Sequence, residues 1–362
     1  MALILEKRQE SLPREKSRGL DMIRARAPLR IGLAGGGTDV SPYPETFGGA
    51  VVSATVSRFA YASVQETRDG RIVLSSSDLG TTSEHNLDES VPVSDPMFLV
   101  KTCFNRLLSI SGRKIDGGLT INTAVDAPPG SGLGSSSAMI VALVGALLEF
   151  FEVELSKNEI AKLAYSIERD DCKVPGGRQD QCSAVWGGIN HFEFPTDDFV
   201  RVHPIKVSQS FSNEFEASTL LYFTGQSRDS AAIIQDQIEN ASSTDLHLLE
   251  PFHGIKEEAS AARQALLKGS LSELAKIIDF GWRKKKATSS LVSNPEIENI
   301  ISVAKDAGAM AAKVSGAGGG GFMFFVVPHE ERHNLRTALR DFGGVSDTAH
   351  LIYSGLEVWR TP

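Results

Sequence analysis

The chain has 362 residues, of which 41% are hydrophobic and 23% charged, the balance of a folded protein long enough for two domains. Its formal net charge of −8 argues against a nucleic-acid binder, which needs a basic face to neutralise phosphates. Three cysteines without CxxC spacing exclude a disulfide framework and a zinc ribbon, and a reduced cytoplasm is the expected location. Every apolar run is shorter than the ~18 residues that span a bilayer, so we expect no membrane partner.

The N-terminal residues 1–21 hold a short apolar patch followed by mixed charges, which predicts a flexible extension and not a signal peptide. In the first half, the expected strands are 23–34 (irregular at Pro28), 51–56, 59–65, 71–75, 118–125 and 187–194, and the expected helices are 96–111, 139–151 and 155–171. Residues 76–95 are polar and rich in turn formers. Ser156 and Glu159 form a predicted capping box.

In the second half, the expected strands are 218–224, two strands around a glycine loop within 311–327, and 350–359; the expected helices are 230–238, two within 245–290, 295–308 and 329–343. Strands and helices mix without a regular βαβ repeat, which favours an α+β fold over a doubly wound sheet. The polar stretch 195–213 is the predicted boundary, so we expect one domain at 22–198 and a second at 199–362.

The strongest motif is PPGSGLGSSSA, residues 128–138, in which a strand leads through glycines into a helix. Backbone N–H groups at a helix start form a ready anion site, and the hydroxyls of Ser135, Ser136 and Ser137 can bind phosphate oxygens or Mg²⁺. The alternative is an ordinary strand–turn–helix junction with a serine cap. The motif is not a Walker A loop, because no lysine precedes the serines. It is not the dinucleotide-binding fingerprint GxGxxG either, because Ser135 stands at the position of the third glycine.

Two further glycine loops stand at 34–39 (AGGGTD) and 315–322 (SGAGGGGF). The second formally matches GxGxxG, but a strand follows it where a dinucleotide site needs a helix. Consecutive glycines cost backbone entropy, which indicates close approach to a ligand or another backbone, the alternative being a hairpin turn. In the loop AGGGTD, Thr38 and Asp39 offer a hydroxyl and a carboxylate that can bind sugar hydroxyls. The alternative is a plain turn closed by Asp39.

Two acidic residues are candidates for chemistry. Glu168 ends a helix expected to pack beside the one that opens at the glycine–serine loop, where a carboxylate can hold Mg²⁺. Asp180 lies in PGGRQDQ and can orient or accept a proton from a hydroxyl, the alternative being an ion pair with Arg178. The stretch HEERH at 329–333 matches the zinc-protease pattern HExxH, but its charged, surface-type helix offers no third ligand or dry pocket, so zinc catalysis is not expected.

The three motifs APLRIGLAGGGTD, PPGSGLGSSSA and KVSGAGGGGF resemble, in order and spacing, those of the GHMP kinases over nearly the whole chain from residue 23. The resemblance implies a two-domain α+β fold, with a ribosomal protein S5-like N-terminal domain and a ferredoxin-like C-terminal domain, and ATP with Mg²⁺ in the cleft between them. It implies that Ser136 and Glu168 hold Mg²⁺, that Asp180 is the base, and that Arg30 lies beside that aspartate.

Within this family, LAGGGTDVSPYPETFGGAVVSATV is similar to the heptose 7-phosphate kinases. These enzymes phosphorylate the anomeric hydroxyl of D-glycero-D-manno-heptose 7-phosphate to the 1,7-bisphosphate, in the biosynthesis of nucleotide-activated heptose. The expected partners are therefore ATP and a sugar phosphate, with a homodimer as one assembly. Galactokinases carry GEHTDY where this chain has GGGTDV, which argues against galactose. Fucokinase-type enzymes carry a similar GGxTD, and a non-catalytic sugar sensor or a mevalonate-type decarboxylase would share the fold.

The residues that the motifs and the resemblance together nominate are these. Catalysis is assigned to Asp180 and Arg30; ATP binding to Pro129, Gly130, Ser131, Gly132, Leu133, Gly134, Ser135, Ser136 and Ser137; Mg²⁺ binding to Ser136 and Glu168; and substrate binding to Gly36, Gly37, Thr38, Asp39, Gly177, Thr224, Arg228, Gly318 and Gly319. Thr224 and Arg228 belong to TGQSRDS in the second domain, where they are expected to bind a substrate phosphate, although Arg228 alternatively caps the following helix.

Overall fold

The computed structural model describes residues 22–87, 91–93, 96–197, 199–226 and 230–361. The expected N-terminal extension and Arg228 therefore lie outside the described residues. None of the described helices combines the length and the apolar character needed to cross a bilayer.

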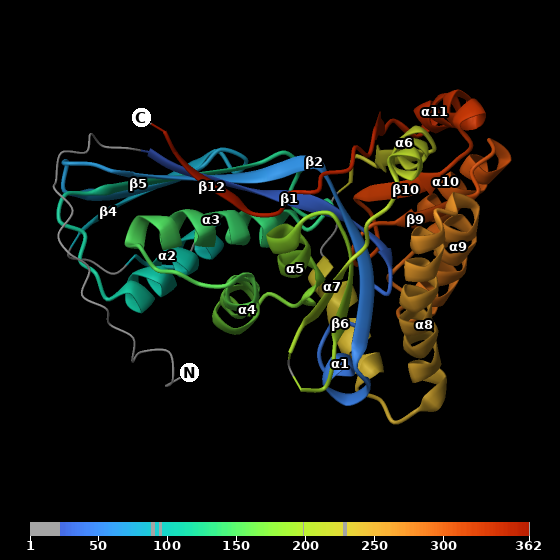
Figure 1. The fold of residues 1–362 in the computed structure, drawn as a ribbon, viewed down its shortest axis with the longest axis horizontal. Helices are drawn as coiled ribbons and strands as arrows, with labels where there is room; N and C mark the ends of the chain where they lie inside the picture. Colours follow the sequence, from blue (N-terminus) through green and yellow to red (C-terminus); the bar gives the residue numbers. More distant parts are fainter. Residues whose placement is uncertain (1–21, 88–90, 94–95, 198, 227–229, 362) are drawn as a thin grey trace.

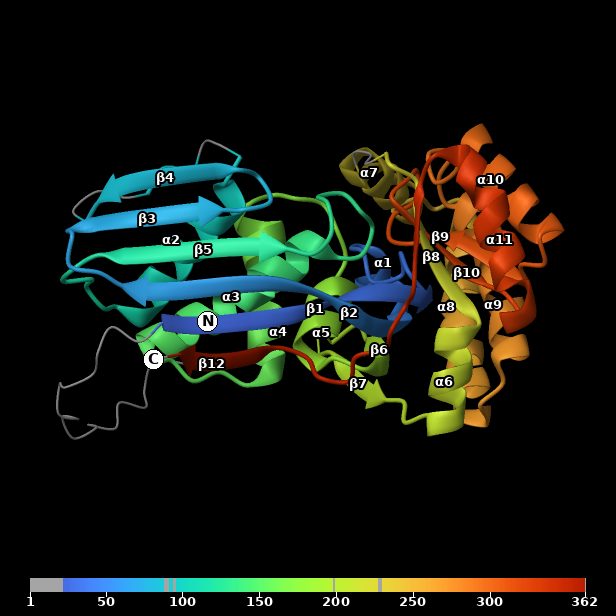
Figure 2. The same ribbon diagram turned by 90° about the horizontal axis from the view of Figure 1, so that it is seen from above.

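The larger of two sheets forms the left part of Figure 1 and is seen from above in Figure 2. Its strands are β1 (Met22–Ala34), β2 (Gly49–Glu66), β3 (Arg71–Ser76), β4 (Thr81–Asn86), β5 (Leu119–Val125), β6 (Ile189–Phe194), β7 (Arg201–Pro204) and β12 (Glu357–Thr361). The main order is β12-β1-β2-β5-β3-β4, and β6 pairs with the start of β2 and with β7. Only the β3–β5 pairing among these is parallel. The predicted irregularity at Pro28 is confirmed, since the β1–β2 register shifts between Pro28 and Leu29.

Four helices lie along one face of this sheet (Figure 1): α2 (Phe98–Ser111), α3 (Ser135–Phe151), α4 (Lys157–Ser166) and α5 (Gln179–Trp186). A short helix, α1 (Tyr43–Phe47), precedes β2. Helix α3 is apolar nearly all round and is buried over most of its length, as expected for a helix between a sheet and other helices. The predicted capping box at Ser156 and Glu159 starts α4.

The second sheet has the order β11-β8-β10-β9. Its strands are β8 (Thr219–Phe223), β9 (Ala311–Val314), β10 (Phe322–Val326) and β11 (Val345–Asp347), and the helices of this half are α6 (Gln209–Ala217), α7 (Ser230–Ala241), α8 (Leu246–Lys268), α9 (Leu271–Ala287), α10 (Pro295–Asp306) and α11 (Arg332–Ala338). Strand β10, FMFFV, is buried throughout because it lies between β8 and β9. Short 3₁₀ turns at His329–Glu331 and Leu339–Phe342 flank α11.

The α+β class is confirmed, while several elements differ from the sequence prediction. The stretch 76–95, expected as turns, contains β4, whose polar residues alternate between exposed and half-buried because it is an edge strand. The expected boundary 195–213 contains β7 and α6, and the last strand is 357–361, not 350–359. Both β7 and β12 lie beyond residue 199 yet pair with the first sheet, so the division at 198/199, which stays a prediction, does not separate the two sheets.

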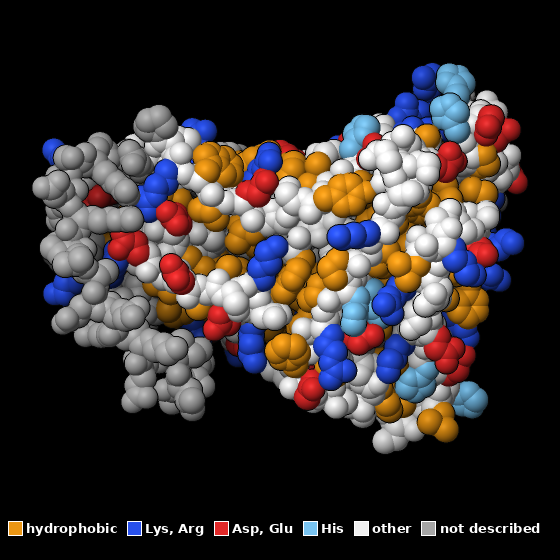
Figure 3. All heavy atoms as spheres, viewed as in Figure 1, with side chains coloured by type: hydrophobic (Ala, Val, Ile, Leu, Met, Phe, Trp, Pro, Cys, Tyr) orange, Lys and Arg blue, Asp and Glu red, His pale blue; other side chains and the backbone are white. Residues whose placement is uncertain are grey.

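Acidic and basic side chains are interspersed on the face drawn in Figure 3, with hydrophobic side chains between them. The charges on this face are not gathered by sign. The described residues of this face therefore carry no single-sign charged patch that would indicate a binding surface.

Candidate active site

All three glycine loops meet at one cavity. The cavity is lined by Gly36 and Gly37 of the first loop, by Ser136 and Ser137 at the start of α3, and by Gly316 and Ala317 of the third loop. The side chains that add charge to its wall come from both halves of the molecule: Arg30, Asp39, Glu168, Arg169, Asp180, Lys285 and Lys313. Segments far apart in the sequence thus form a single site.

The glycine–serine loop ends where α3 begins. Gly134 is the N-cap residue of α3 with φ 75°, a left-handed conformation that glycine adopts without strain. The 17-residue helix α3 therefore begins at the cavity, which Ser136 and Ser137 of its first turn line. Backbone N–H groups and the helix dipole at this end favour a bound anion such as a phosphate. The backbone N–H of Arg30 also donates to the carbonyl of Leu133 (3.0 Å), which fixes the loop to β1.

The third glycine loop packs directly on the second. The backbone N–H of Phe322 donates to the carbonyl of Ser131 (2.8 Å), and the hydroxyl of Ser315 donates to the carbonyl of Gly132 (3.0 Å). A Cβ on Gly316 would lie 2.9 Å from the Cα of Gly132, closer than a side chain tolerates. The glycines at this contact are therefore required because two backbones touch there.

The predicted metal ligands face each other. Glu168 lies in a π-helical turn, Ile167–Asp171, that follows α4, and it is fully buried. The hydroxyls of Ser136 and Ser137 donate to its Oε1 (2.8 Å) and Oε2 (2.6 Å), and Gln181 Nε2 donates to Oε2 (2.7 Å). A hydroxyl and a carboxylate that line one cavity form an all-oxygen donor set, which fits Mg²⁺.

The predicted base, Asp180, is held against the phosphate loop. Arg30 on β1 donates from Nε to Oδ1 of Asp180 (2.8 Å), and its Nη2 forms an ion pair with the same oxygen (2.6 Å). Asp180 is in the first turn of α5. Arg30 Nη1 also donates to the carbonyl of Gly132 (2.6 Å). A Cβ on Gly134 would lie 3.2 Å from Oδ2 of Asp180, so this oxygen faces the start of α3. One arginine therefore holds both the carboxylate and the loop.

The loop AGGGTD places Asp39 and Thr38 in different surroundings. Asp39 lines the cavity, and its Oδ1 and Oδ2 accept from the N–H groups of Gly37 (3.1 Å) and Gln179 (2.9 Å). Gly177 also lines the cavity, and a Cβ there would collide with the Asp39 carboxylate. Thr38 is fully buried, and its hydroxyl donates to the carbonyls of Gly35 and Ala50 (both 2.9 Å). The hydroxyl of Thr38 thus closes the loop and, unlike the prediction, does not line the cavity.

Three other predicted substrate residues also lie off the cavity wall. Gly318 packs on Val292, and the N–H of Gly319 donates to the Val292 carbonyl (2.8 Å). The Thr224 hydroxyl donates to the carbonyl of Gly321 (3.2 Å). The part of the third loop that does reach the cavity is Gly316 and Ala317, because the loop turns away toward the Val292 backbone after these residues.

Two half-buried lysines that the sequence analysis missed also line the cavity. Lys285 on α9 donates to the carbonyl of Gly36 (2.8 Å), and Lys313 on β9 lies near the carbonyl of Leu33 (3.4 Å). Burial, and then the charge of Lys313, lowers the pKa of Lys285 to about 8, and burial also lowers the pKa of Lys313. Among the described residues neither ammonium forms an ion pair within 4.0 Å, so both remain available to an anion.

Glu258 on α8 lies beneath the same loop. It is nearly fully buried, and its Oε2 accepts the N–H of Gly35 (3.3 Å). Burial raises the pKa of Glu258 to about 7, against the opposing charges of Lys313 and Lys285. Lys313 is the first residue of the third motif, KVSGAGGGGF, a position that could have nominated it. Lys285 is one of three consecutive lysines, and only the orientation of α9 distinguishes it.

Comparison with known proteins places this geometry in a family. The family model for the GHMP kinases N-terminal domain matches residues 99–188, and the model for the GHMP kinases C-terminal domain matches residues 262–345. The chain is 38% identical over 338 residues to the D-glycero-alpha-D-manno-heptose 7-phosphate kinase of Campylobacter jejuni, covering 93% of this chain and 99% of that protein. It is 28% identical to the L-fucokinase/L-fucose-1-P guanylyltransferase of Bacteroides fragilis over 84% of this chain but 34% of that protein.

Solved structures agree with the sequence comparison. A D-glycero-D-manno-heptose 1-phosphate kinase from Bacteroides thetaiotaomicron superposes with a TM-score of 0.79 at 35% identity, covering 94% of this chain and 99% of that one. The galactokinase of Lactococcus lactis, at 20% identity and a TM-score of 0.71, shares the fold. With three glycine loops around one cavity, both halves matched by the family models, and a relative 38% identical along its whole length, the chain belongs to the GHMP kinases.

Proposed function

We propose that this chain transfers the γ-phosphoryl group of Mg-ATP to the anomeric hydroxyl of D-glycero-D-manno-heptose 7-phosphate, which yields the 1,7-bisphosphate and ADP. The observation that carries the proposal is the position of Asp180 between Arg30 and the start of α3, in the cavity that all three glycine loops line. The choice of acceptor rests on the 38% identity to the heptose 7-phosphate kinase of Campylobacter jejuni.

Phosphoryl transfer passes through a loose transition state, so the protein mainly positions groups and stabilises charge. The N–H groups of the glycine–serine loop and of α3 would hold the ATP phosphates. Ser136 and Glu168 would hold Mg²⁺, which neutralises phosphate charge when bound. The preformed hydrogen bond between these two side chains (2.8 Å) keeps both oxygen donors at the same point of the cavity wall.

Asp180 would orient the acceptor hydroxyl and take its proton. Its Oδ1 is occupied by Arg30, while among the described residues no hydrogen bond to its Oδ2 is formed. As the sugar oxygen bonds to the γ-phosphorus, the bond to the β,γ-bridging oxygen breaks and the hydroxyl proton passes to Oδ2. A positioned base of this kind typically contributes about 10²–10⁴-fold to the rate.

The two half-buried lysines favour an anionic acceptor over a free sugar. Lys285 touches the first glycine loop and Lys313 lines the same cavity, so both lie where the acceptor would bind. An ammonium removed from water interacts strongly with a phosphate, because the local dielectric constant is low. A free sugar such as fucose would add no negative charge beside the two ammonium groups, whereas a sugar phosphate would. We therefore infer that Lys285 and Lys313 bind the phosphate of the sugar phosphate.

The test is ³¹P NMR of the purified protein with Mg-ATP and a panel of acceptors: heptose 7-phosphate, unphosphorylated heptose, fucose and mevalonate. We expect an anomeric phosphate signal that grows with ADP for heptose 7-phosphate, with at most slow turnover of unphosphorylated heptose and none of fucose or mevalonate. Turnover of fucose but not of heptose 7-phosphate would show that the protein is a fucokinase-type enzyme. ATP binding without turnover of any acceptor would indicate a sensor.

Matched variants separate the roles of the residues. Lys285→Met and Lys313→Met should raise KM for heptose 7-phosphate and leave any slow turnover of unphosphorylated heptose unchanged. An equal decrease of kcat/KM for both acceptors would contradict a role of these lysines in phosphate binding. Asp306→Asn, an exposed aspartate at the end of α10, is the control for removal of a carboxylate. A homodimer and a cytoplasmic location stay predictions.

A further inference from the structure

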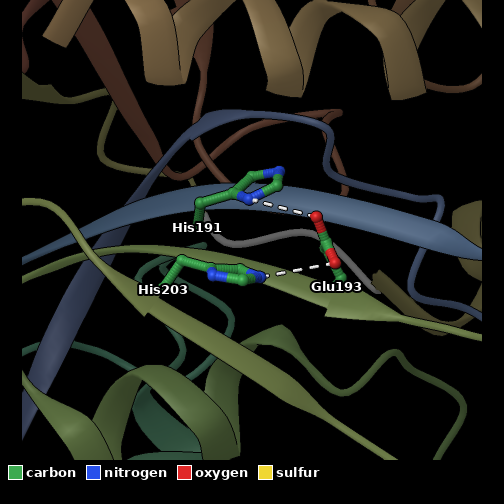
Figure 4. Close-up of side chains that lie close together, drawn as sticks. All are labelled: His191, Glu193 and His203. Atoms are coloured by element: carbon green, nitrogen blue, oxygen red, sulfur yellow. Dashed lines mark ion pairs between the residues drawn. The ribbon is translucent and has the colours of Figure 1, made fainter. Parts of the chain in front are cut away.

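A cluster of two histidines and a glutamate lies on the β6–β7 ribbon, apart from the residues that line the cavity (Figure 4). His191 and Glu193 are two residues apart on β6 and point to the same face, and His203 on β7 pairs directly with His191. The two imidazole rings have centroids 5.7 Å apart at an angle of 32°. One ligand atom from each residue lies within 4.8 Å of the other two.

The buried member of the cluster lacks hydrogen bonds. His191 is 2% exposed, and among the described residues neither of its ring nitrogens has a hydrogen-bond partner, nor has Nε2 of His203. Buried polar side-chain atoms almost always have a partner, so an imidazole that is buried with both nitrogens unpaired calls for an explanation. Its Nδ1 is directed toward the Glu193 carboxylate (Figure 4).

The spacing between the side chains fits an ion better than direct hydrogen bonds. Oε1 of Glu193 is 3.8 Å from Nδ1 of His191, and Oε2 is 3.4 Å from Nε2 of His203. Both distances exceed those of good hydrogen bonds. Two donors about 2.1 Å from one tetrahedral ion are about 3.4 Å apart. The two measured distances are thus close to this spacing, each with a different oxygen of Glu193, and one ligand atom from each of the three residues lies within 4.8 Å of the others.

The charge of the cluster also suits a cation. The Glu193 carboxylate lies 3.8 Å from Nδ1 of His191 and 3.4 Å from Nε2 of His203, while Arg263 acts on His191 with an opposing charge.

We propose that His191, Glu193 and His203 form a binding site for a divalent transition-metal ion of the zinc type. Two imidazole nitrogens and one carboxylate oxygen are a donor set for Zn²⁺, whereas Mg²⁺ prefers oxygen ligands throughout. The side chains of Glu193 and His203 are 37% and 38% exposed, while the facing nitrogens of His191 and His203 are buried, so a bound ion would lie at the edge of the β6–β7 ribbon with the carboxylate on its outer side.

The position of the site assigns it a structural role. Strand β7 is a four-residue edge strand that pairs with β6 only, and the chain continues from it to α6 beside the second sheet. An ion shared by His191 and His203 would cross-link β6 and β7 on the segment that connects the two halves of the molecule. Because the ion binds the folded chain, the thermal midpoint should rise with the concentration of Zn²⁺.

The test is calorimetric titration of the chelator-treated, full-length protein with Zn²⁺ alone, in a background of millimolar Mg²⁺ that occupies the phosphate site. We expect one Zn²⁺ per chain in the wild type. His203→Ala and Glu193→Gln should each weaken Zn²⁺ binding by roughly 100-fold. Loss of a residue that only contacts a metal ligand already lowers metal affinity by about 10–100-fold, and loss of a ligand should cost at least as much. His350→Ala is the matched control, because His350 pairs with Glu216 (2.9 Å) at an exposed site where the described part of the chain supplies no third ligand.

Both altered side chains are partly exposed, so the metal-free variants should unfold at the same thermal midpoint as the metal-free wild type. If His203→Ala does not fold, Glu193→Gln, which keeps the size of the side chain, still provides the test. A second readout is Co²⁺ in place of Zn²⁺, whose visible absorption reports a low coordination number with nitrogen ligands. Wild-type binding no tighter than that of Glu193→Gln, or loss of the same site in His350→Ala, would overturn the proposal. The kinase reaction plays no part in this readout, so failure of one proposal leaves the other standing.

Discussion

The contact between the second and third glycine loops can be tested with a single methyl group. Gly132 has φ 81°, and a Cβ there would lie 3.1 Å from the carbonyl carbon of Ser315 and closer still to its oxygen. An alanine in the left-handed region costs about 1–2 kcal/mol. The steric conflict with Ser315 adds to this cost, since overpacking a tight contact typically costs about 1–3 kcal/mol more.

The matched control is Gly112→Ala. Gly112 ends α2 with φ 60°, and a Cβ there meets nothing within 4 Å. The control therefore carries the backbone cost without the contact. We expect Gly132→Ala to lower the free energy of unfolding by about 1–3 kcal/mol more than Gly112→Ala does, as measured by urea denaturation.

The same substitution should act on catalysis, because the loop that it displaces is the one proposed to hold the ATP phosphates. A shift of about 1 Å in a reacting group can reduce the rate about 10²-fold. Steady-state kinetics should show a higher KM for ATP and a lower kcat in Gly132→Ala, with both values unchanged in Gly112→Ala. Equal destabilisation in the two variants, together with normal kinetics, would refute the view that these loops touch.

Three further predictions concern the proposed chemistry. Asp180→Asn should reduce kcat by about 10²–10⁴-fold with little change in KM for ATP, and near-normal turnover would rule out Asp180 as the base. Ser136→Ala and Glu168→Gln should each raise the Mg²⁺ concentration that gives half-maximal rate. An unchanged dependence of the rate on Mg²⁺ would show that these residues are not Mg²⁺ ligands. Lys285 has a pKa lowered to about 8 by burial, so it is charged below that pH and neutral above it. KM for the sugar phosphate should therefore rise as the pH passes through about 8 in the wild type. Lys285→Arg should lose this dependence, because a guanidinium stays protonated, and a pH profile that Lys285→Arg does not alter would contradict the assignment.

The sequence was most informative where chemistry depends on a continuous stretch of backbone. The glycine–serine loop that leads into a helix and the capping box of α4 were predicted, because glycine at positive φ and a capping serine are local requirements, although α3 begins at Ser135 and not at the expected residue 139. Strands with alternating or continuous apolar residues were found for the same reason. The polar edge strand β4 and the short strand β7 were missed, because neither has an apolar face that a pattern can reveal.

By itself, then, the sequence determined the α+β class, the three glycine loops, and their identity as those of a GHMP kinase. Only the tertiary structure decided which side chains share a space. The packing of α9 and β9 brings Lys285 and Lys313 to the cavity, and the β6–β7 register sets His203 opposite His191. Packing likewise turns Thr38 and Gly318 away from the cavity wall. The reason is physical: local sequence encodes local conformation, whereas the direction of a side chain across neighbouring elements depends on helix orientation and strand register.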